Sequence, residues 1–260
     1  MNSTIMQGGA RYPSLNNKVV LITGGASGIG KSLVEHFHDQ GCQVAFVDLN
    51  HEAGVAVVDE LGQKDGHAPY FEACDLKDLD ALKAVIDRVN AKFGAITVLV
   101  NNAGNDDRHK LDSVTSEYFD DRIAVNLKHQ LFTAKYIHEQ MKAAGGGSII
   151  NFSSITWMDA DGDCPVYVTA KAAIVGLTRA LATELGPEGI RVNAIAPGWI
   201  MTERQVTKWL DENGERTIKT RQALLGKLYP PDVARMALWL AADDSRMCSK
   251  QTFIVDGGWI

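Results

Sequence analysis

Three side chains in the second half of the chain have the types and the spacing of a proton-transfer site. Tyr167 follows Ser154 by thirteen residues and precedes Lys171 by four. Residues four apart on a helix share one face, so the Lys171 ammonium can lie beside the Tyr167 phenol and favour its ionised form. The pair therefore predicts an acid/base built on a tyrosine. Because Tyr-x-x-x-Lys is frequent by chance in a chain of this length, the prediction depends on the motifs around it.

A glycine-rich loop near the start of the chain has the pattern of a dinucleotide-binding turn. Gly24, Gly28 and Gly30 follow an apolar run and open a segment that is expected to be helical to about residue 40. Glycine lets the backbone turn sharply and approach a pyrophosphate, whose charge a helix N-terminus favours. We expect Gly28, Ile29 and Gly30 to contact the pyrophosphate, with Ser27 hydrogen-bonding nearby.

The end of the second apolar run indicates which dinucleotide binds. Asp48 lies eighteen residues after Gly30, where a carboxylate can accept hydrogen bonds from both hydroxyls of the adenosine ribose. The 2′-phosphate of NADP would meet that charge, and neither Ser27 nor Leu49 is a basic residue that could neutralise it. The sequence therefore predicts NAD, with NADP binding more weakly. Further cofactor contacts are expected at Leu49, at Asp75 and Leu76 beside the adenine, and at Asn102, Ala103 and Gly104 beside a ribose.

Composition limits the classes of protein and of partner. A chain of 260 residues with 45% hydrophobic and 22% charged residues is typical of a folded globular protein. We find no linker, so residues 1–260 are expected to form one domain behind a loose arm at 1–17. No apolar run approaches a membrane span and the arm lacks a signal-peptide core, so we expect a cytoplasmic protein. The net charge of −6 favours a small-molecule partner over nucleic acid or a membrane surface.

The four cysteines and seven histidines show no metal-binding spacing. The cysteines are scattered without a Cys-x-x-Cys pair, which is typical of free thiols in a reducing compartment. His36 and His38 are two apart and would face different sides of their helix. We therefore expect no metal, and histidines at the surface or at the edge of the core.

Short β-branched runs alternate with amphipathic stretches along the whole chain. Continuous apolar runs such as Val-Val-Leu-Ile indicate strands that are covered on both faces. The sequence predicts a single-domain α/β Rossmann-type fold, a doubly wound parallel seven-stranded sheet with helices on both faces and ligands at the carboxyl edge. The strands are expected at 19–23, 43–47, 68–72, 98–100, 148–152, 191–195 and 252–255.

Two regions carry predictions about motion and assembly. Residues 200 to 228, approximately, are rich in charge with scattered apolar residues, which favours a mobile substrate lid over a fixed surface excursion. The expected helices at 117–143 and 166–185 carry more apolar and small residues than one buried face requires. We expect a part of each helix to meet a second copy of the chain across a two-fold axis.

Together these motifs resemble the short-chain dehydrogenase/reductase family over nearly the whole chain. The resemblance implies that Tyr167 is the general base for alcohol oxidation and that Ser154 holds the substrate oxygen. It implies that Lys171 binds the nicotinamide ribose and lowers the pKa of Tyr167, and that Asn126 anchors a water that relays the proton. It also implies a second two-fold contact through 255–260, and thus a homotetramer, with a dimer as the alternative. The matching residues are the glycine loop, Asn-Asn-Ala-Gly at 101–104, Asn126, Ser154, Tyr167, Lys171 and Pro197-Gly198 with Thr202. The resemblance also implies cofactor contacts after the sixth strand, at Pro197, Gly198, Ile200 and Thr202.

The physics of the tyrosine agrees with this role. Useful tyrosinate near pH ~8 requires the tyrosine pKa to fall by roughly two units, or about 3 kcal/mol. An ammonium at ~4 Å supplies about 4 kcal/mol at an effective dielectric constant of 20. Plainer alternatives stay open for three residues: Asn126 or Thr202 could cap a turn or helix, and Ser153 could replace Ser154.

The segment after the Asn-Asn-Ala-Gly motif indicates the substrate. Residues 105–110 are all polar, and this segment with the tail from Trp209 onward resembles bacterial aldopentose 1-dehydrogenases that act on D-xylose or L-arabinose. We expect Asn105 and Asp106 to meet sugar hydroxyls and Trp157 and Trp199 to present flat faces, unless the tryptophans are plain core. The implied reaction is hydride transfer from C1 of the sugar to NAD⁺ with formation of a lactone. The alternatives are another sugar, a polyol or a 3-oxoacyl substrate and, remotely, a non-catalytic NAD sensor.

Overall fold

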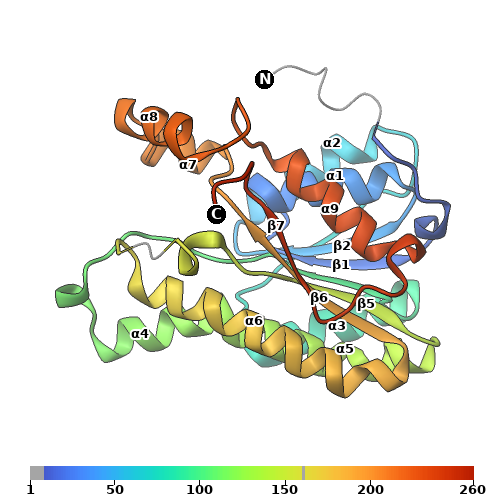
Figure 1. The fold of residues 1–260 in the computed structure, drawn as a ribbon. Helices are drawn as coiled ribbons and strands as arrows, with labels where there is room; N and C mark the ends of the chain where they lie inside the picture. Colours follow the sequence, from blue (N-terminus) through green and yellow to red (C-terminus); the bar gives the residue numbers. More distant parts are fainter. Residues whose placement is uncertain (1–8, 160–161) are drawn as a thin grey trace.

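Seven parallel strands form the central sheet in the order β3-β2-β1-β4-β5-β6-β7 (Figure 1). The computed structural model describes residues 9–159 and 162–260. All six pairings between neighbouring strands are parallel, which confirms the predicted doubly wound sheet. The strands are β1 Val19–Thr23, β2 Gln43–Asp48, β3 Tyr70–Ala73, β4 Val98–Asn101, β5 Gly147–Phe152, β6 Ile190–Pro197 and β7 Thr252–Val255.

Most strands lie where the apolar runs placed them, and the third shows why boundaries shift. It was expected from residue 68 but begins at Tyr70, which pairs with Ala45 of β2. Pro69 directly precedes it and has no N–H to give to a strand ladder.

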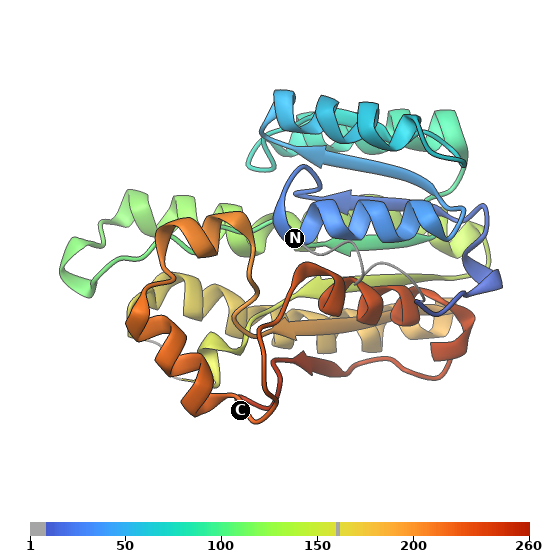
Figure 2. The ribbon, with the colours of Figure 1, turned by 90° about the horizontal axis from the view of Figure 1, so that it is seen from above.

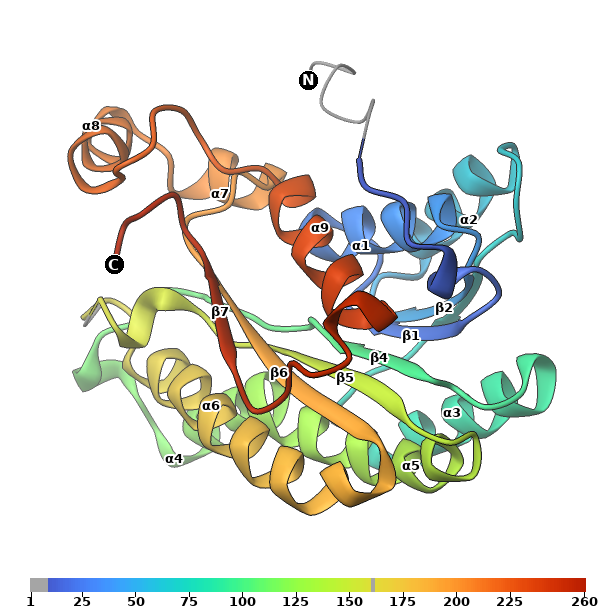
Figure 3. The ribbon, with the colours of Figure 1, turned by 45° about the vertical axis from the view of Figure 1, so that its right-hand side comes forward.

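Helices cover both faces of the sheet, as Figures 1 and 3 show. Side chains alternate along β1, so Val20 and Ile22 pack under α1, α2 and α9, while Leu21 packs with α3, α5 and α6 on the other face. Two separate hydrophobic clusters result. The helices are α1 Gly28–Asp39, α2 His51–Gly62, α3 Leu79–Phe93, α4 Ser116–Ile123, α5 His129–Ala143, α6 Pro165–Leu185, α7 Glu203–Lys208, α8 Glu212–Arg221 and α9 Pro230–Ala241.

The expected helix at 117–143 is interrupted. A π-helical turn at Ala124–Lys128 separates α4 from α5 and contains the buried Asn126. Such turns insert an extra residue into a helix and are frequent at functional sites. Residues of this turn contact α6.

The region expected to be a lid has regular structure of its own. It contains α7 and α8, and Ile200 pairs with Leu228 where the excursion leaves and rejoins the domain. Figure 2, seen from above, places both helices beyond the carboxyl ends of the strands. Thr202 accepts a hydrogen bond from the Gln205 N–H and Asp211 accepts one from the Gly214 N–H, so both helices are capped. That the region moves stays a prediction.

Part of the expected N-terminal arm packs onto the domain. A short 3₁₀ turn at Pro13–Leu15 buries Leu15 completely beneath α1. Residues 1–8 lie outside the described residues. The expectation of a loose arm over 1–17 is therefore wrong for Pro13–Leu15, since one apolar residue in a polar segment has no periodicity to mark its packing.

The histidines are more deeply buried than expected, whereas the cysteines agree with the prediction. His38 and His129 are almost fully buried, and burial lowers the pKa of His129 to about 3, helped by the nearby Lys171. The four cysteines are free thiols. In the described part of the chain we find neither a group of three or more potential metal ligands nor a helix long and apolar enough to cross a membrane.

Candidate active site

A cavity of about 1630 Å³ opens at the carboxyl edge of the sheet. It collects side chains that are distant in sequence, from the loops after β1, β2, β3, β4, β5 and β6. All of the residues predicted to bind the cofactor line it. Of the predicted catalytic and substrate residues, only Asn126 and Trp157 are not in the cavity wall.

The glycine loop is shaped by close backbone packing. A Cβ on Gly30 would lie 1.7 Å from the carbonyl oxygen of Gly24, so no side chain fits there. Asn102 donates from Nδ2 to the carbonyl oxygens of Thr23 (3.1 Å) and Gly24 (3.0 Å), which fastens the loop after β4 to the glycine loop. Ser27 is the N-cap of α1 but accepts no capping hydrogen bond. The first N–H groups of α1 therefore lack a side-chain acceptor at the cavity, as an anion site requires.

Asp48 is held at the end of β2 with both oxygens oriented. Its Oδ2 accepts from the Ala26 N–H and its Oδ1 from the Asn50 N–H, each at 3.0 Å. A carboxylate oxygen has two lone pairs, so each oxygen can still accept from a ribose hydroxyl. Lys77, which also lines this end of the cavity, is paired with Asp75 (3.7 Å) and Asp121 (3.1 Å).

Ser154, Tyr167 and Lys171 meet on the floor of the cavity. The Lys171 Nζ lies 5.5 Å from the centroid of the Tyr167 ring and donates to the Phe152 carbonyl at 2.8 Å. Ser154 hydrogen-bonds to Tyr167, and its Oγ accepts from the Thr156 N–H at 3.2 Å. The hydroxyl of Ser153 instead donates to the Lys171 carbonyl at 2.7 Å. Of the two serines, Ser154 is thus the one whose hydroxyl faces the tyrosine.

Burial dominates the ionisation of this group. It raises the pKa of Tyr167 well above the ordinary value, the charge of Asp106 adds to the rise, and the Ser154 hydrogen bond opposes it. Burial also lowers the pKa of Lys171 to about 8, which Asp106 partly offsets. Burial therefore opposes the lowering of the Tyr167 pKa that we expect from Lys171 together with the positive nicotinamide ring, and that lowering stays a prediction.

Asn126 holds the backbone of the loop after β4 from outside the cavity wall. Its Oδ1 accepts from the Asn105 N–H at 2.7 Å, and its Nδ2 donates to the carbonyls of Asn105 (3.2 Å) and Arg122 (3.0 Å). These contacts are those of the turn-capping alternative. A Cβ on Gly104 would lie 3.2 Å from Asn126 Oδ1 and 3.1 Å from Lys171 Nζ, so the two polar groups converge on this glycine.

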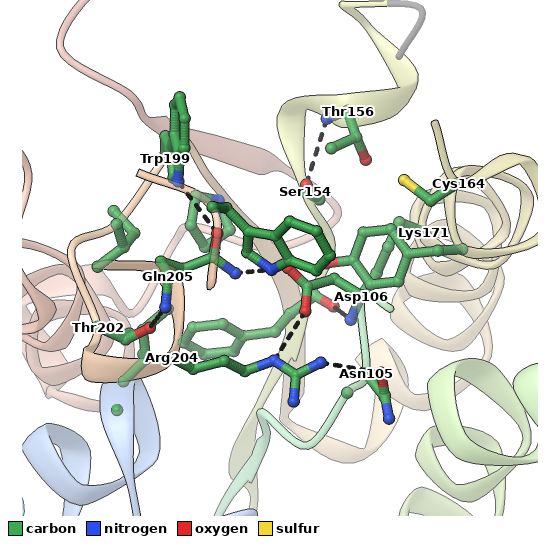
Figure 4. A pocket seen from close by; sticks show the side chains of 18 of the residues that line it. Asn105, Asp106, Ser154, Thr156, Cys164, Lys171, Trp199, Thr202, Arg204 and Gln205 are labelled. Atoms are coloured by element: carbon green, nitrogen blue, oxygen red, sulfur yellow. Dashed lines mark hydrogen bonds and ion pairs between the residues drawn. The ribbon is translucent and has the colours of Figure 1, made fainter. Parts of the chain in front are cut away.

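The opposite wall of the cavity is a chain of polar contacts between α7 and the loop after β4 (Figure 4). The Trp199 Nε1 donates to Gln205 Oε1 at 3.0 Å, and Gln205 Nε2 donates to Asp106 Oδ2 at 2.5 Å. The Arg204 Nε also donates a hydrogen bond to Asp106 Oδ1, at 3.3 Å. Thr202 begins α7 as its N-cap while also lining the cavity, so its capping alternative is confirmed.

Three comparisons with known proteins agree. The family model described as enoyl-(acyl carrier protein) reductase matches residues 24–260. D-xylose 1-dehydrogenase of Caulobacter vibrioides is 48% identical over 250 residues, which cover 96% of this chain and 98% of the relative. The probable galactose dehydrogenase GalD of Rhizobium meliloti is 45% identical over 249 residues, 96% of this chain and 97% of the relative. The chain belongs to the short-chain dehydrogenase/reductase family. A solved short-chain type dehydrogenase/reductase from Mycobacterium ulcerans is 28% identical and covers 95% of this chain and 90% of its own, with a TM-score of 0.90.

This short-chain dehydrogenase is an oxidoreductase that acts on CH–OH groups with NAD(P). The described residues fit that cofactor, because glycine positions that admit no Cβ and a helix N-terminus without a side-chain acceptor adjoin an oriented carboxylate. The similarity to sugar 1-dehydrogenases that the sequence suggested is confirmed.

The structure corrects one substrate residue and adds others. Trp157 does not line the cavity. It lies in the 3₁₀ turn Ile155–Trp157, where consecutive side chains point in different directions and Thr156 rather than Trp157 faces inward. Sequence reasoning missed Arg204 and Gln205, because their only signal was their place in a charged segment without a clear pattern.

Proposed function

We propose that this short-chain dehydrogenase oxidises an aldose, a pentose such as D-xylose or L-arabinose, at C1 to the lactone, and that its cofactor is NAD. The observation that carries the proposal is the position of Tyr167 between Ser154 and a polar wall formed by Asp106, Gln205 and Trp199. A wall of carboxylate, amide and indole groups suits a polyhydroxylated ring and not an acyl chain. The names of the two curated relatives support a sugar.

Each residue of the floor has a part in the proton transfer. Ser154 holds the C1 oxygen, and Tyr167 takes the proton of its hydroxyl. Lys171 binds the nicotinamide ribose and, with Asn126 behind Gly104, lies on the route by which the proton leaves through a water. The chemistry that NAD⁺ would supply when bound is acceptance of the hydride from C1. Because burial raises the pKa of Tyr167, the protein alone disfavours the tyrosinate. A positive charge in the cavity would lower this pKa.

The preference for NAD rests on Asp48. Its two oxygens can accept from the two ribose hydroxyls, whereas a 2′-phosphate would bring a negative charge against it. Lys77, a cation at the same end of the cavity, is already shared by two carboxylates. We therefore expect NADP to be used less efficiently than NAD.

A hexose is the second candidate, because the relative from Rhizobium meliloti carries the name of a galactose dehydrogenase. Both readings use the same floor and differ only in how the wall meets carbon atoms beyond C1. An NAD sensor without catalysis is disfavoured, since Ser154, Tyr167 and Lys171 lie together beneath the cavity.

The test is NADH formation with a panel of pentoses, hexoses, polyols and a 3-hydroxyacyl thioester, each also measured with NADP⁺. We expect D-xylose or L-arabinose to give the highest kcat/KM, and the product to be a lactone by NMR. Tyr167→Phe is the matched control for background reduction. A polyol or a 3-hydroxyacyl thioester as the best substrate would contradict the proposal, and the absence of NADH with every compound would favour a sensor.

We also propose that the protein is a cytoplasmic homotetramer. Phe119 on α4 and Leu131 on α5 are 42% and 41% exposed, and Ile254 and Ile260 at the C-terminus are 43% and 51% exposed. These two groups of apolar side chains lie where the two expected two-fold contacts would cover them.

A further inference from the structure

The Asp106 carboxylate lies between α7 and the floor of the cavity, two parts of the enzyme that are distant in sequence. On one side it is bound by α7, through Gln205 Nε2 at 2.5 Å and Arg204 Nε at 3.3 Å. On the other side its charge raises the pKa of Tyr167 and of Lys171 in the floor of the cavity, where Lys171 is buried and Tyr167 is half-buried. Its side chain is 25% exposed, so water screens it only in part.

Arg204 bridges two neighbouring carboxylates that differ in what they face. It binds Asp107 through a terminal guanidinium nitrogen at 2.5 Å, in addition to its contact with Asp106. Asp107 also lies 3.9 Å from Arg122 on α4, whereas Asp106 is the carboxylate that acts most strongly on Tyr167. Both pairs join α7 to the loop after β4, but Asp106 has the stronger electrostatic effect on the tyrosine.

We propose that Arg204 is a positioning residue for the base: by pairing with Asp106 where α7 is docked, it offsets part of a negative charge that opposes formation of the Tyr167 phenolate. The inference deepens the proposed function, on which it rests. It links the position of α7 to the ionisation of Tyr167, so that α7 affects the fraction of ionised base as well as access to the cavity.

Other charged groups near the tyrosine do not replace this one. Arg108, from the same loop as Asp106, opposes the rise in the pKa of Tyr167, and Cys164 before α6 adds to it. The Lys171 ammonium faces the ring. The Arg108 guanidinium also lies 5.4 Å from the ring of Trp209, directly after α7, and so adds a further contact between this loop and the excursion. Undocking α7 could therefore disturb the site without any change at Asp106, and the experiment must separate these two routes.

The test is the pH dependence of kcat/KM for oxidation in four variants: Arg204→Met, Arg204→Lys, Asp106→Asn and Asp107→Asn. Arg204→Met should move the limb on which activity rises to higher pH by roughly half a unit or more, since Asp106 is then unneutralised. Arg204→Lys keeps the positive charge, so its limb should lie close to that of the wild type. Asp106→Asn should move the limb to lower pH.

The controls separate electrostatics from docking. Asp107→Asn weakens the hold on α7 without touching the charge that faces Tyr167, so it should raise KM and leave the limb in place. In an Asp106→Asn background, Arg204→Met should cause no further shift, as a double-mutant cycle requires of a residue acting through Asp106. An equal shift in the presence and absence of the Asp106 charge, or a shift with Asp107→Asn as large as with Arg204→Met, would overturn the proposal.

Hydrogen exchange in 203–208 supplies a readout that does not depend on the substrate. Both Arg204→Met and Asp107→Asn should speed exchange there, because each breaks an ion pair that holds α7. If the sugars are not oxidised but another alcohol is, the proposed function fails and the pH limbs are measured with that alcohol. Unchanged exchange in both variants would show that these pairs do not hold α7, whatever the substrate.

Discussion

The two halves of the cavity are built by different means. The cofactor half is shaped mainly by close backbone packing: Gly30 admits no Cβ against Gly24, and the Asn102 side chain donates to two carbonyls of the glycine loop. The substrate half consists of side chains from α7 and the loop after β4, of which Asp106 and Gln205 are examples. A backbone site suits a ligand part that never changes, the pyrophosphate. A side-chain wall on an excursion can change its specificity with few substitutions, since no strand of the sheet depends on it.

The largest expected effect is at the floor between the two halves. Tyr167→Phe removes the proton acceptor and should lower kcat by at least about 100-fold while NAD binding, followed by protein fluorescence, stays nearly intact. Retention of a tenth of the wild-type turnover would show that another group is the base.

Gly30→Ala tests the backbone half. The new methyl group would lie 1.7 Å from the Gly24 carbonyl oxygen, so the loop must move or the chain must unfold. We expect NAD affinity to fall by about 100-fold or more and the melting temperature to fall as well. Gly214→Ala in the substrate half meets the edge of the Trp199 ring at 2.8 Å, and we expect it to change KM for the sugar more than NAD affinity.

Asp48→Ala tests whether a charge in the cofactor half selects NAD over NADP. It removes two acceptors for the ribose and one charge that repels a 2′-phosphate, so NAD should weaken and NADP should improve, each by about 10-fold. Catalytic efficiencies with the two cofactors, in the wild type and the variant, check this. A wild type that prefers NADP would refute the role assigned to Asp48.

The pH profile tests how the floor depends on charge. Because burial raises the pKa of Tyr167, the tyrosinate forms only as pH rises, so oxidation should increase with pH until the base is ionised. Lys171→Met removes a cation beside the ring and should move that limb to higher pH. Stopped-flow rates of NADH formation across pH check both, and an unchanged limb in the variant would mean that Lys171 does not tune the tyrosine.

The smallest effect on chemistry is expected outside both halves. Phe119→Glu with Leu131→Glu places charges on exposed apolar positions that do not line the cavity. Light scattering at micromolar concentration should show a tetramer for the wild type and smaller species for the variant. A wild-type monomer would mean that these side chains are not an interface.

Much of the fold and of the cofactor half was predictable from the sequence, because local rules determine both. Buried parallel strands require continuous apolar runs, and all seven were found; the glycine spacing and Asp48 lie at fixed distances from strand ends. Tyr167 and Lys171 were predictable for the same reason, since a four-residue spacing on one helix is local. Trp157 lies outside the cavity wall because of the rotation of a short turn, which composition cannot show.

Only the tertiary structure decided the substrate half and the ionisation of the floor. Arg204 and Gln205 lie almost one hundred residues from Asp106 along the chain, so their contacts follow from how α7 crosses the edge of the sheet. Likewise, burial raises the pKa of Tyr167 although its nearest charged neighbour on the helix is a lysine. Desolvation depends on everything packed around a group, whereas the sequence alone specifies only its neighbours along the helix.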